Sequence, residues 1–184
     1  MGSTCVVGLQ WGDEAKGKIV DLLCDHHDVV VRYQGGANAG HTVVHEGVTY
    51  KLSLVPTGIL RENVDAVIGN GVVIHPPALL KEVAGLTAQG VDFTGRLHVG
   101  DRAHVILPHH LAEERLTEES ASAADHLGTT RRGIGPCYRD KFGRVHGVRI
   151  ADLYHPAQFR ERLKRIVEFK NRLLTAMLPD FEPF

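Results

Sequence analysis

The sequence lacks the features that mark membrane proteins, disulfide-stabilised proteins and nucleic-acid binders. No apolar run approaches the roughly 18 residues that a membrane span requires, and no charged-then-apolar leader opens the chain. Its three cysteines are odd in number and contain no C-x-x-C pair, and its formal net charge is only -1. We therefore expect a cytoplasmic protein with reduced thiols and with neither a membrane nor a nucleic acid as its partner.

What is present is ordinary globular composition with an uneven distribution of charge. Of the 184 residues, 43% are hydrophobic and 23% are charged. A chain of this length buries roughly 70% of the surface that its unfolded form exposes, so it can form a core without disulfides. Residues 1–130 carry 9 basic and 16 acidic side chains, whereas residues 131–172 carry 12 and 4. The second stretch is a local basic region.

Short apolar runs and glycine-rich turns alternate with helical patterns. Strands are predicted at residues 4–9, 28–33, 65–71, 96–99 and 104–107, with a hairpin formed by residues 42–45 and 49–55. Helices are predicted near residues 19–23, 78–83 and 111–119 and from Pro156 to Met177. The alternation predicts an α/β fold with a P-loop-like, mainly parallel sheet flanked by helices, a small antiparallel hairpin and a mostly helical carboxyl-terminal part.

A candidate phosphate loop lies near the amino terminus. Residues 12–18 read G-D-E-A-K-G-K, which satisfies G-x-x-x-x-G-K between a predicted strand and a helix. Backbone N–H groups and the helix dipole favour phosphate there, although a plain glycine-rich turn is the alternative. Asp13 and Glu14 would repel phosphate unless a metal intervenes or one of them moves a proton. They could also simply be helix N-terminal acids that the dipole stabilises.

Two further glycine-rich segments carry polar side chains. Residues 38–41 read N-A-G-H after a predicted strand, where α/β sheets bind ligands, and His41 could act as a general acid. The alternative is an ordinary surface histidine. Residues 128–136 combine two threonines, two arginines and three glycines, which suits a phosphate monoester, although a solvated loop is equally compatible. No aromatic stacking platform accompanies the basic residues behind it, which favours an anionic ligand over nucleic acid.

Taken together, these segments closely resemble the adenylosuccinate synthetase family. The likeness is carried in order by residues 10–18, 32–42, 58–60, 68–73 and 128–136. It implies a ligase in which GTP phosphorylates the 6-oxygen of IMP and the amine of L-aspartate displaces that phosphate. The products would be adenylosuccinate, GDP and phosphate, with Mg²⁺ required, in the committed step from IMP toward AMP in purine biosynthesis.

The resemblance also implies roles for individual residues. Asp13 would be the general base that removes the N1 proton of IMP, and His41 the acid that assists departure of the GTP β-phosphate. Mg²⁺ would be held by Asp13 and the Gly40 carbonyl, and Arg144 would reach across a homodimer to the partner's IMP phosphate. The expected GTP contacts are Gly12, Asp13, Glu14, Ala15, Lys16, Gly17, Lys18, Gly40, His41 and Thr42. The expected IMP contacts are Asp13, Glu14, Ala15, Lys16, Asn38, Ala39, Gly40, His41, Thr130 and Arg144.

The sequence departs from the family pattern in two residues and in length. The family usually has glycine where Ala15 and Arg131 stand, and its chains are more than twice as long. The T-K-x-D segment that reads guanine and the arginine-containing loop that recognises aspartate are absent from residues 1–184. We therefore interpret the chain as the amino-terminal portion of a synthetase domain, with a phosphate loop at residues 8–18 and a helical part at about residues 108–178. We expect no turnover from it alone.

Three alternatives accompany this interpretation. The first is a truncated, non-catalytic nucleotide-binding module or pseudoenzyme that retains the phosphate loop. The second, a general GTPase, is disfavoured because Ile19 replaces the Mg²⁺-binding hydroxyl and no guanine-reading motif follows. The third is the related phage class that aminates a guanine nucleotide. By the resemblance, that class lacks the loop aspartate, so Asp13 favours IMP.

Overall fold

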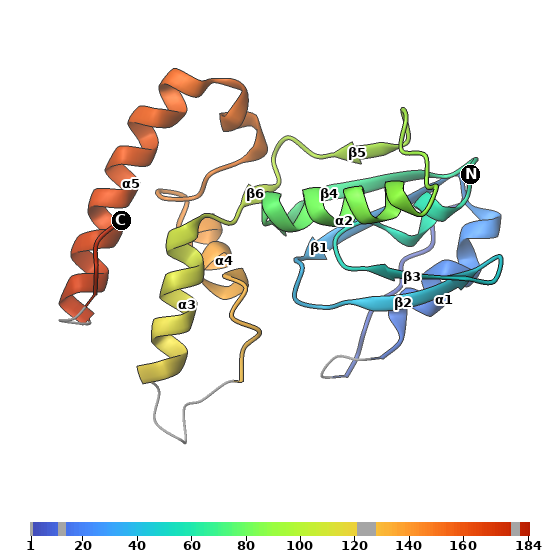
Figure 1. Ribbon diagram of the computed structural model, residues 1–184, viewed down its shortest axis with the longest axis horizontal. Coiled ribbons are helices and arrows are strands. Elements are labelled where there is room, and N and C mark those ends of the chain that lie inside the picture. Colours follow the sequence, from blue (N-terminus) through green and yellow to red (C-terminus); the bar gives the residue numbers. More distant parts are fainter. Residues whose placement is uncertain (1, 11–13, 121–127, 178–180) are drawn as a thin grey trace.

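A parallel sheet centred on one long strand organises the protein. The computed structural model describes residues 2–10, 14–120, 128–177 and 181–184 (Figure 1). The central strand β4 (Asp65–Ile74) pairs in parallel with three shorter strands, and its consecutive residues Val72 and Val73 are fully buried, so both of its faces are covered there. The predicted mainly parallel sheet is therefore confirmed. Its strands are β1 (Val29–Gly35), β4 (Asp65–Ile74), β5 (Leu97–Val99) and β6 (His104–Val105).

The predicted antiparallel hairpin is formed by β2 (His41–His45) and β3 (Val48–Leu52). Glu46 and Gly47 connect the strands with φ of 49° and 78°, the left-handed values that two-residue hairpin turns require. Strand pairing ends at Leu52 rather than continuing to residue 55. The reason is that Glu82 accepts hydrogen bonds from the next three backbone N–H groups, which are therefore unavailable to a ladder.

Helices cover the sheet and the hairpin. Helix α1 (Lys16–Leu23) packs against β2, and α2 (Pro76–Ala88) begins with the two prolines that a first helical turn accepts. A core of buried Val43, Leu52, Ala66 and Leu86 joins the hairpin, β4 and α2. Short 3₁₀ turns at Cys24–His26 (η1) and Thr57–Leu60 (η2) lead into β1 and toward β4.

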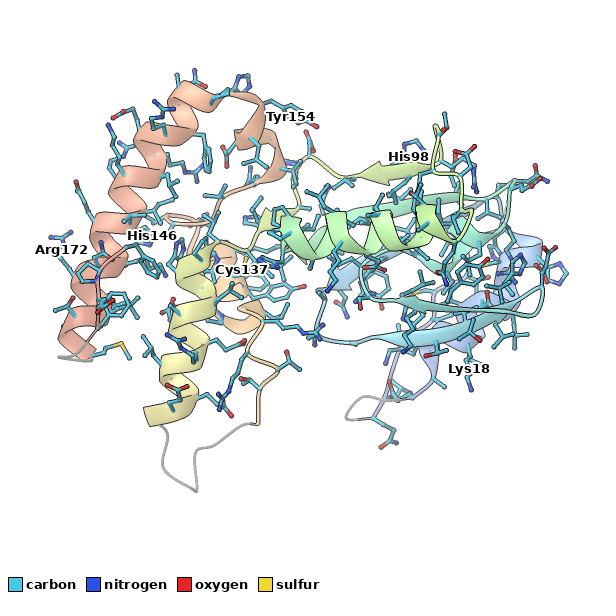
Figure 2. All side chains as sticks on the ribbon, in the orientation of Figure 1. Lys18, His98, Cys137, His146, Tyr154 and Arg172 are labelled. Atoms are coloured by element: carbon cyan, nitrogen blue, oxygen red, sulfur yellow. The ribbon has the colours of Figure 1, made fainter. Side chains whose placement is uncertain are left out.

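The carboxyl-terminal part is helical, as expected, and gathers to one side of the sheet (Figure 1). Helix α4, which the sequence had suggested was partly loop, meets the sheet through Cys137, buried with Val73 and Ile106 (Figure 2). The long amphipathic helix α5 has the predicted bounds. The elements are α3 (Pro108–Ser120), α4 (Ile134–Gly143), the 3₁₀ segment η3 (Ile150–Tyr154) and α5 (Pro156–Met177).

The predicted first strand, residues 4–9, is not formed, and that prediction was wrong. Val7 and Leu9 are 58% and 87% exposed, so an extended conformation there gains little burial. The segment touches its surroundings through single hydrogen bonds, such as that from the Tyr33 hydroxyl to the Val6 carbonyl. The phosphate-loop sequence therefore follows an irregular segment rather than a strand. Among the described residues no helix is long and apolar enough to span a membrane.

Candidate functional site

The start of α1 is open to an anion. Among the described residues no side chain caps this end and the first turn contains no acidic residue, so the N–H groups of Lys16 and Gly17 have no partner there, whereas the Lys18 N–H donates to the Ala15 carbonyl at 2.9 Å. Ala15 precedes the helix with φ of 56°, in the left-handed region. Lys16 and Lys18 are exposed there, and Figure 2 shows Lys18 projecting from the outer side of the molecule. Gly12 and Asp13, expected at this site, lie outside the described residues.

Glu14 folds back onto the segment to which it belongs. Its carboxylate accepts hydrogen bonds from the Lys16 ammonium and, at 2.6 Å, from the Gln10 backbone N–H. These two bonds lower the pKa of Glu14, the bond from Lys16 contributing most. An arriving phosphate therefore competes with an internal carboxylate for Lys16. The competition is weak because the Lys16 side chain is 44% exposed and solvent screens it.

His41, a predicted site residue, lies against α1. It is the first residue of β2, and a Cβ added to Gly17 would come within 2.8 Å of its ring atoms Cγ and Cδ2. Its Nε2 is buried and has no hydrogen-bond partner among the described residues. Burial, followed by the charge of Arg32, lowers the pKa of His41, so the imidazole is neutral in the free chain. Thr42 follows on the exposed side of the strand.

The segment between β1 and β2 presents Asn38, Ala39 and Gly40 to solvent, at the carboxyl end of β1. Its backbone is held from two directions. The Arg32 guanidinium donates to the Gly36 carbonyl at 2.6 Å, and the Arg132 guanidinium donates to the Ala37 carbonyl. The structure thus brings the glycine cluster that precedes His41 (residues 35–40) into contact with residues 128–136, which we call the threonine-containing loop.

Tyr138 of α4 makes a second connection between these two parts. Its hydroxyl accepts from the Gly35 N–H at 2.8 Å and lies 2.8 Å from the Gly71 carbonyl, to which it can donate. Ile134 packs so tightly on Gly36 that a side chain at Gly36 would overlap it. Neither Tyr138 nor Arg32 has a role in the site that was predicted from the sequence. The only signal for Arg32 was a charged residue inside an apolar strand.

Two buried carboxylates of α3 hold the threonine-containing loop. Glu118 accepts from the Thr129 N–H at 3.1 Å, and Glu114 accepts from the Gly133 N–H at 2.7 Å at the start of α4. The N-terminus of α4 is therefore occupied by a carboxylate, in contrast to that of α1. Thr130 is exposed, and Arg131 has φ of 53°.

Arg144 is not brought together with Thr130. It is the exposed residue that ends α4, with φ of 63°, whereas Thr130 precedes the beginning of the same helix. A helix of 10 residues is about 15 Å long. Within one chain the two residues therefore belong to opposite ends of α4.

A cleft of about 830 Å³ lies away from this site. It is lined by segments that precede β1, β4 and β5, at the amino ends of parallel strands, whereas α/β sheets bind ligands at the carboxyl ends. Its two arginines are already engaged. Arg61 pairs with Asp21 and Asp25, and Arg96 donates to backbone carbonyls. We do not assign the site to this cleft.

A buried ionic cluster between α3, α4 and α5 was not predicted from the sequence. His109, His110 and Asp140 place possible metal-ligating atoms within 4.8 Å of one another. However, the Leu107 N–H donates to His110 Nδ1 at 2.9 Å, so the His110 proton lies on Nε2, which faces Asp140. The Lys170 ammonium, 2.8 Å from Asp140, already supplies a cation. These contacts fit a structural cluster and do not fit a metal ion.

Comparisons with known proteins agree along almost the whole chain. Residues 5–183 match the family described as adenylosuccinate synthetase. The adenylosuccinate synthetase of Caldanaerobacter subterraneus subsp. tengcongensis is 54% identical over 174 residues, which are 94% of this chain and 40% of that protein. The chain therefore spans about 40% of the length of the curated relatives it matches.

Two solved structures share the fold. The fully ligated adenylosuccinate synthetase from Plasmodium falciparum superimposes with a TM-score of 0.81 at 36% identity, covering 92% of this chain and 39% of that one. Cyanophage S-2L succinoaminodeoxyadenylate synthetase, bound to dGMP and dATP, gives a TM-score of 0.57 at 31% identity, with coverage of 73% and 36%.

Proposed function

The chain belongs to the adenylosuccinate synthetase family, and we propose that it forms the amino-terminal, phosphate-binding portion of a GTP-dependent ligase of IMP and L-aspartate. One observation carries the proposal above the others. His41 presents a buried, unpartnered Nε2 beside Gly17, at the uncapped start of a helix that favours anions. A cytoplasmic place in purine biosynthesis, leading to AMP, belongs to the same proposal.

GTP would bind across the start of α1 and the beginning of β2. The N–H groups of Lys16 and Gly17 and the exposed ammonium groups of Lys16 and Lys18 would face its phosphates, with Gly40, His41 and Thr42 alongside. The negative charge of the phosphates would oppose the effects that lower the pKa of His41. His41 would then gain a proton on binding and donate it toward the β-phosphate as that group departs.

IMP would lie between the glycine cluster and the threonine-containing loop. Asn38, Ala39 and Thr130 are exposed on two segments that Arg132 and Tyr138 tie together. Mg²⁺ accepts hard oxygen ligands, and the exposed Gly40 carbonyl fits that requirement. Gly40 and Asp13 would hold the ion, which would neutralise charge developing on the phosphates. Asp13 would also take the N1 proton of IMP.

Arg144 would serve a second copy of the chain in a homodimer. It is exposed, and its sequence neighbours Phe142 and Val145 are apolar side chains that are 76% and 70% exposed. Because Arg144 lies at the far end of α4 from Thr130, its charge would act in a neighbouring protomer's IMP site.

Calorimetric titration of the chain with GTP and with IMP, each with Mg²⁺, tests the proposal. We expect binding of both, loss of GTP binding in His41→Asn, and no loss in His98→Asn, whose exposed side chain lies on β5 (Figure 2). Absence of binding by both nucleotides would contradict the proposal. Because the cyanophage structure holds dGMP, tighter binding of dGMP than of IMP would favour the guanine-aminating class.

The same preparation distinguishes a ligase portion from a non-catalytic nucleotide-binding module. We expect no adenylosuccinate from the chain with GTP, IMP, aspartate and Mg²⁺. Addition of the remaining segment of the Caldanaerobacter protein should restore product if this chain retains the catalytic groups. Nucleotide binding without product in that mixture would favour the module.

A further inference from the structure

Arg32 connects two segments that flank His41. Its Nη2 donates to the Gly36 carbonyl at 2.6 Å, and its Nη1 donates to the Ser53 carbonyl. Gly36 belongs to the cluster that precedes His41, and Ser53 follows Leu52, the residue paired with His41 across the hairpin. One planar guanidinium therefore fixes the distance between these two segments.

Glu82 of α2 holds the same peptide from the opposite side. Its carboxylate accepts from the N–H groups of Ser53, Leu54 and Val55 at 2.7, 2.9 and 3.1 Å. Ser53 is thus bound to a cation through its carbonyl and to an anion through its N–H. Such charge-assisted bonds are roughly twice as strong as neutral ones.

Ser53 in turn lies next to Gly40, one of the residues proposed to bind the nucleotide. A Cβ on Gly40 would be 3.6 Å from Ser53 Oγ and 3.7 Å from the Leu52 carbonyl, which is ordinary contact. Arg32, Ser53 and Glu82 therefore form a platform under Gly40 and His41. The positive charge of Arg32 is also close enough to His41 to disfavour its protonation.

We propose that Arg32, braced through Ser53 by Glu82, is a positioning residue that holds His41 against Gly17 in the arrangement that receives the nucleotide phosphates. The inference rests on the proposed function for the identity of that ligand. The placement of His41 is a property of the free chain and can be measured without it.

Arg96 offers a matched control. It also donates to backbone carbonyls, those of Arg61 and Val64 among them, but at the amino ends of the strands, remote from His41. If Arg32 had a purely structural role, replacing Arg32 and replacing Arg96 would have the same effect on His41. If Arg32 positions His41, only its replacement should move the imidazole.

The experiment compares Arg32→Lys, Arg32→Gln and Arg96→Gln by NMR of the free chain. We expect the nuclear Overhauser contact between the His41 ring and Gly17 to be lost in both Arg32 variants and kept in Arg96→Gln. The pKa of His41 should rise in Arg32→Gln, where the cation is gone, and stay low in Arg32→Lys, where the charge remains but the fork is lost. If Arg32→Gln fails to fold, Arg32→Lys carries the test.

Calorimetry then tests whether the position of His41 affects the binding of GTP. Both Arg32 variants should bind GTP at least about tenfold more weakly than the parent chain, while Arg96→Gln should bind like the parent. Retention of the His41 to Gly17 contact in both Arg32 variants, or an equal loss in Arg96→Gln, would overturn the inference. If the parent chain itself does not bind GTP, the proposed function fails, and the NMR comparison still decides the role of Arg32.

Discussion

The imidazole of His41 lies directly against the backbone of Gly17, so that a Cβ on Gly17 would approach ring atoms Cγ and Cδ2 to 2.8 Å. The contact joins α1 to β2, which are separated in the sequence by η1 and β1. Glycine permits it because it has no side chain to occupy the space. The close approach couples the start of α1 to the first residue of the hairpin.

Gly17→Ala should weaken ligand binding while leaving the stability of the fold nearly unchanged. Alanine favours a helix over glycine by about 1 kcal/mol, so the helix itself gains, while the new methyl group displaces the His41 ring. We expect GTP affinity to fall at least about tenfold in calorimetry, with little loss of unfolding free energy. Unchanged GTP binding would contradict the assigned contact.

Gly85→Ala is the matched control for this substitution. Gly85 lies within α2, and nothing lies within 4 Å of the position of its added Cβ. Alanine favours the helix over glycine there too, but the added methyl group displaces no neighbouring side chain. We expect a gain of about 1 kcal/mol in urea unfolding and unchanged nucleotide binding.

Ala15 and Arg131 occupy left-handed backbone positions, with φ of 56° and 53°, a region that glycine enters more readily than other residues. A Cβ in that region costs about 1–2 kcal/mol, from which the greater entropy of unfolded glycine must be subtracted. Ala15→Gly and Arg131→Gly should therefore each raise the unfolding free energy by up to about 1 kcal/mol in urea titrations.

Ala84→Gly serves as a comparison in which the unfolding free energy should fall instead of rise. Ala84 is exposed in the middle of α2, where alanine is the best residue and glycine loses about 1 kcal/mol. If Ala15→Gly destabilised the chain as much as Ala84→Gly does, the left-handed conformation of residue 15 would be wrong.

Local sequence signals predicted the elements that local physics determines. Pro156 and the 3.6-residue apolar period predicted the bounds of α5, and the glycine among residues 46–48 predicted the hairpin connection, which the structure narrows to Glu46 and Gly47. Residues 4–9 failed because an apolar run becomes a strand only where it finds a partner to pair with. Helix α4 was missed because its start is satisfied by Glu114, a carboxylate 19 residues away in the sequence.

The segments that form the candidate site could be recognised in the sequence, whereas the side-chain contacts that join these segments could not. Glycine clusters marked the segments around Gly17, Gly40 and Thr130 because a close backbone approach to a ligand favours glycine. The guanidinium of Arg32 on two carbonyls and the hydroxyl of Tyr138 on Gly35 depend on tertiary contacts that no spacing encodes. Asp13, the expected base, stays a prediction.

Tyr138→Phe should loosen the connection between the glycine cluster and α4. The ring remains, but the Gly35 N–H and the Gly71 carbonyl lose their hydroxyl partner. These groups are half-buried and a typical hydrogen bond contributes about 1 kcal/mol, so urea unfolding should show a loss of about that size and IMP binding should weaken. Tyr154→Phe, at a 73% exposed ring, should change neither quantity (Figure 2). Equal effects of the two substitutions would contradict the role of Tyr138.

Lys170 should be among the most sensitive residues of the chain. It is 1% exposed, with its ammonium 3.2 Å from Glu113 and 2.8 Å from Asp140. Lys170→Met leaves these two buried carboxylates without that cation, and removing one partner of a buried pair costs about 3–5 kcal/mol. Lys164→Met removes a solvent-exposed partner of Glu161 and should cost less than about 1 kcal/mol. A small effect at Lys170 would show that the cluster is hydrated.

Acid should weaken the fold through two buried histidines. Burial, together with the charge of Lys170, lowers the pKa of His109 to about 3, and burial, then Lys141 and Arg149, lowers that of His104 to about 4. Unfolded histidine titrates near pH 6.5, so between these values the unfolded chain binds more protons. The unfolding free energy should therefore fall as the pH drops below about 6.5 and continue falling toward pH 4.

Urea titrations between pH 7 and pH 5 isolate this effect from the carboxylates. Burial raises the pKa of Asp140, but hydrogen bonds from His110 and Lys170 outweigh it and hold the pKa well below its usual range, so Asp140 stays ionised throughout. His109→Gln removes one titrating group and should make the pH dependence shallower. His98→Gln, at an exposed ring, should leave the slope of the parent chain. Equal slopes for His109→Gln and the parent would mean that His109 reaches water and protonates in the folded state.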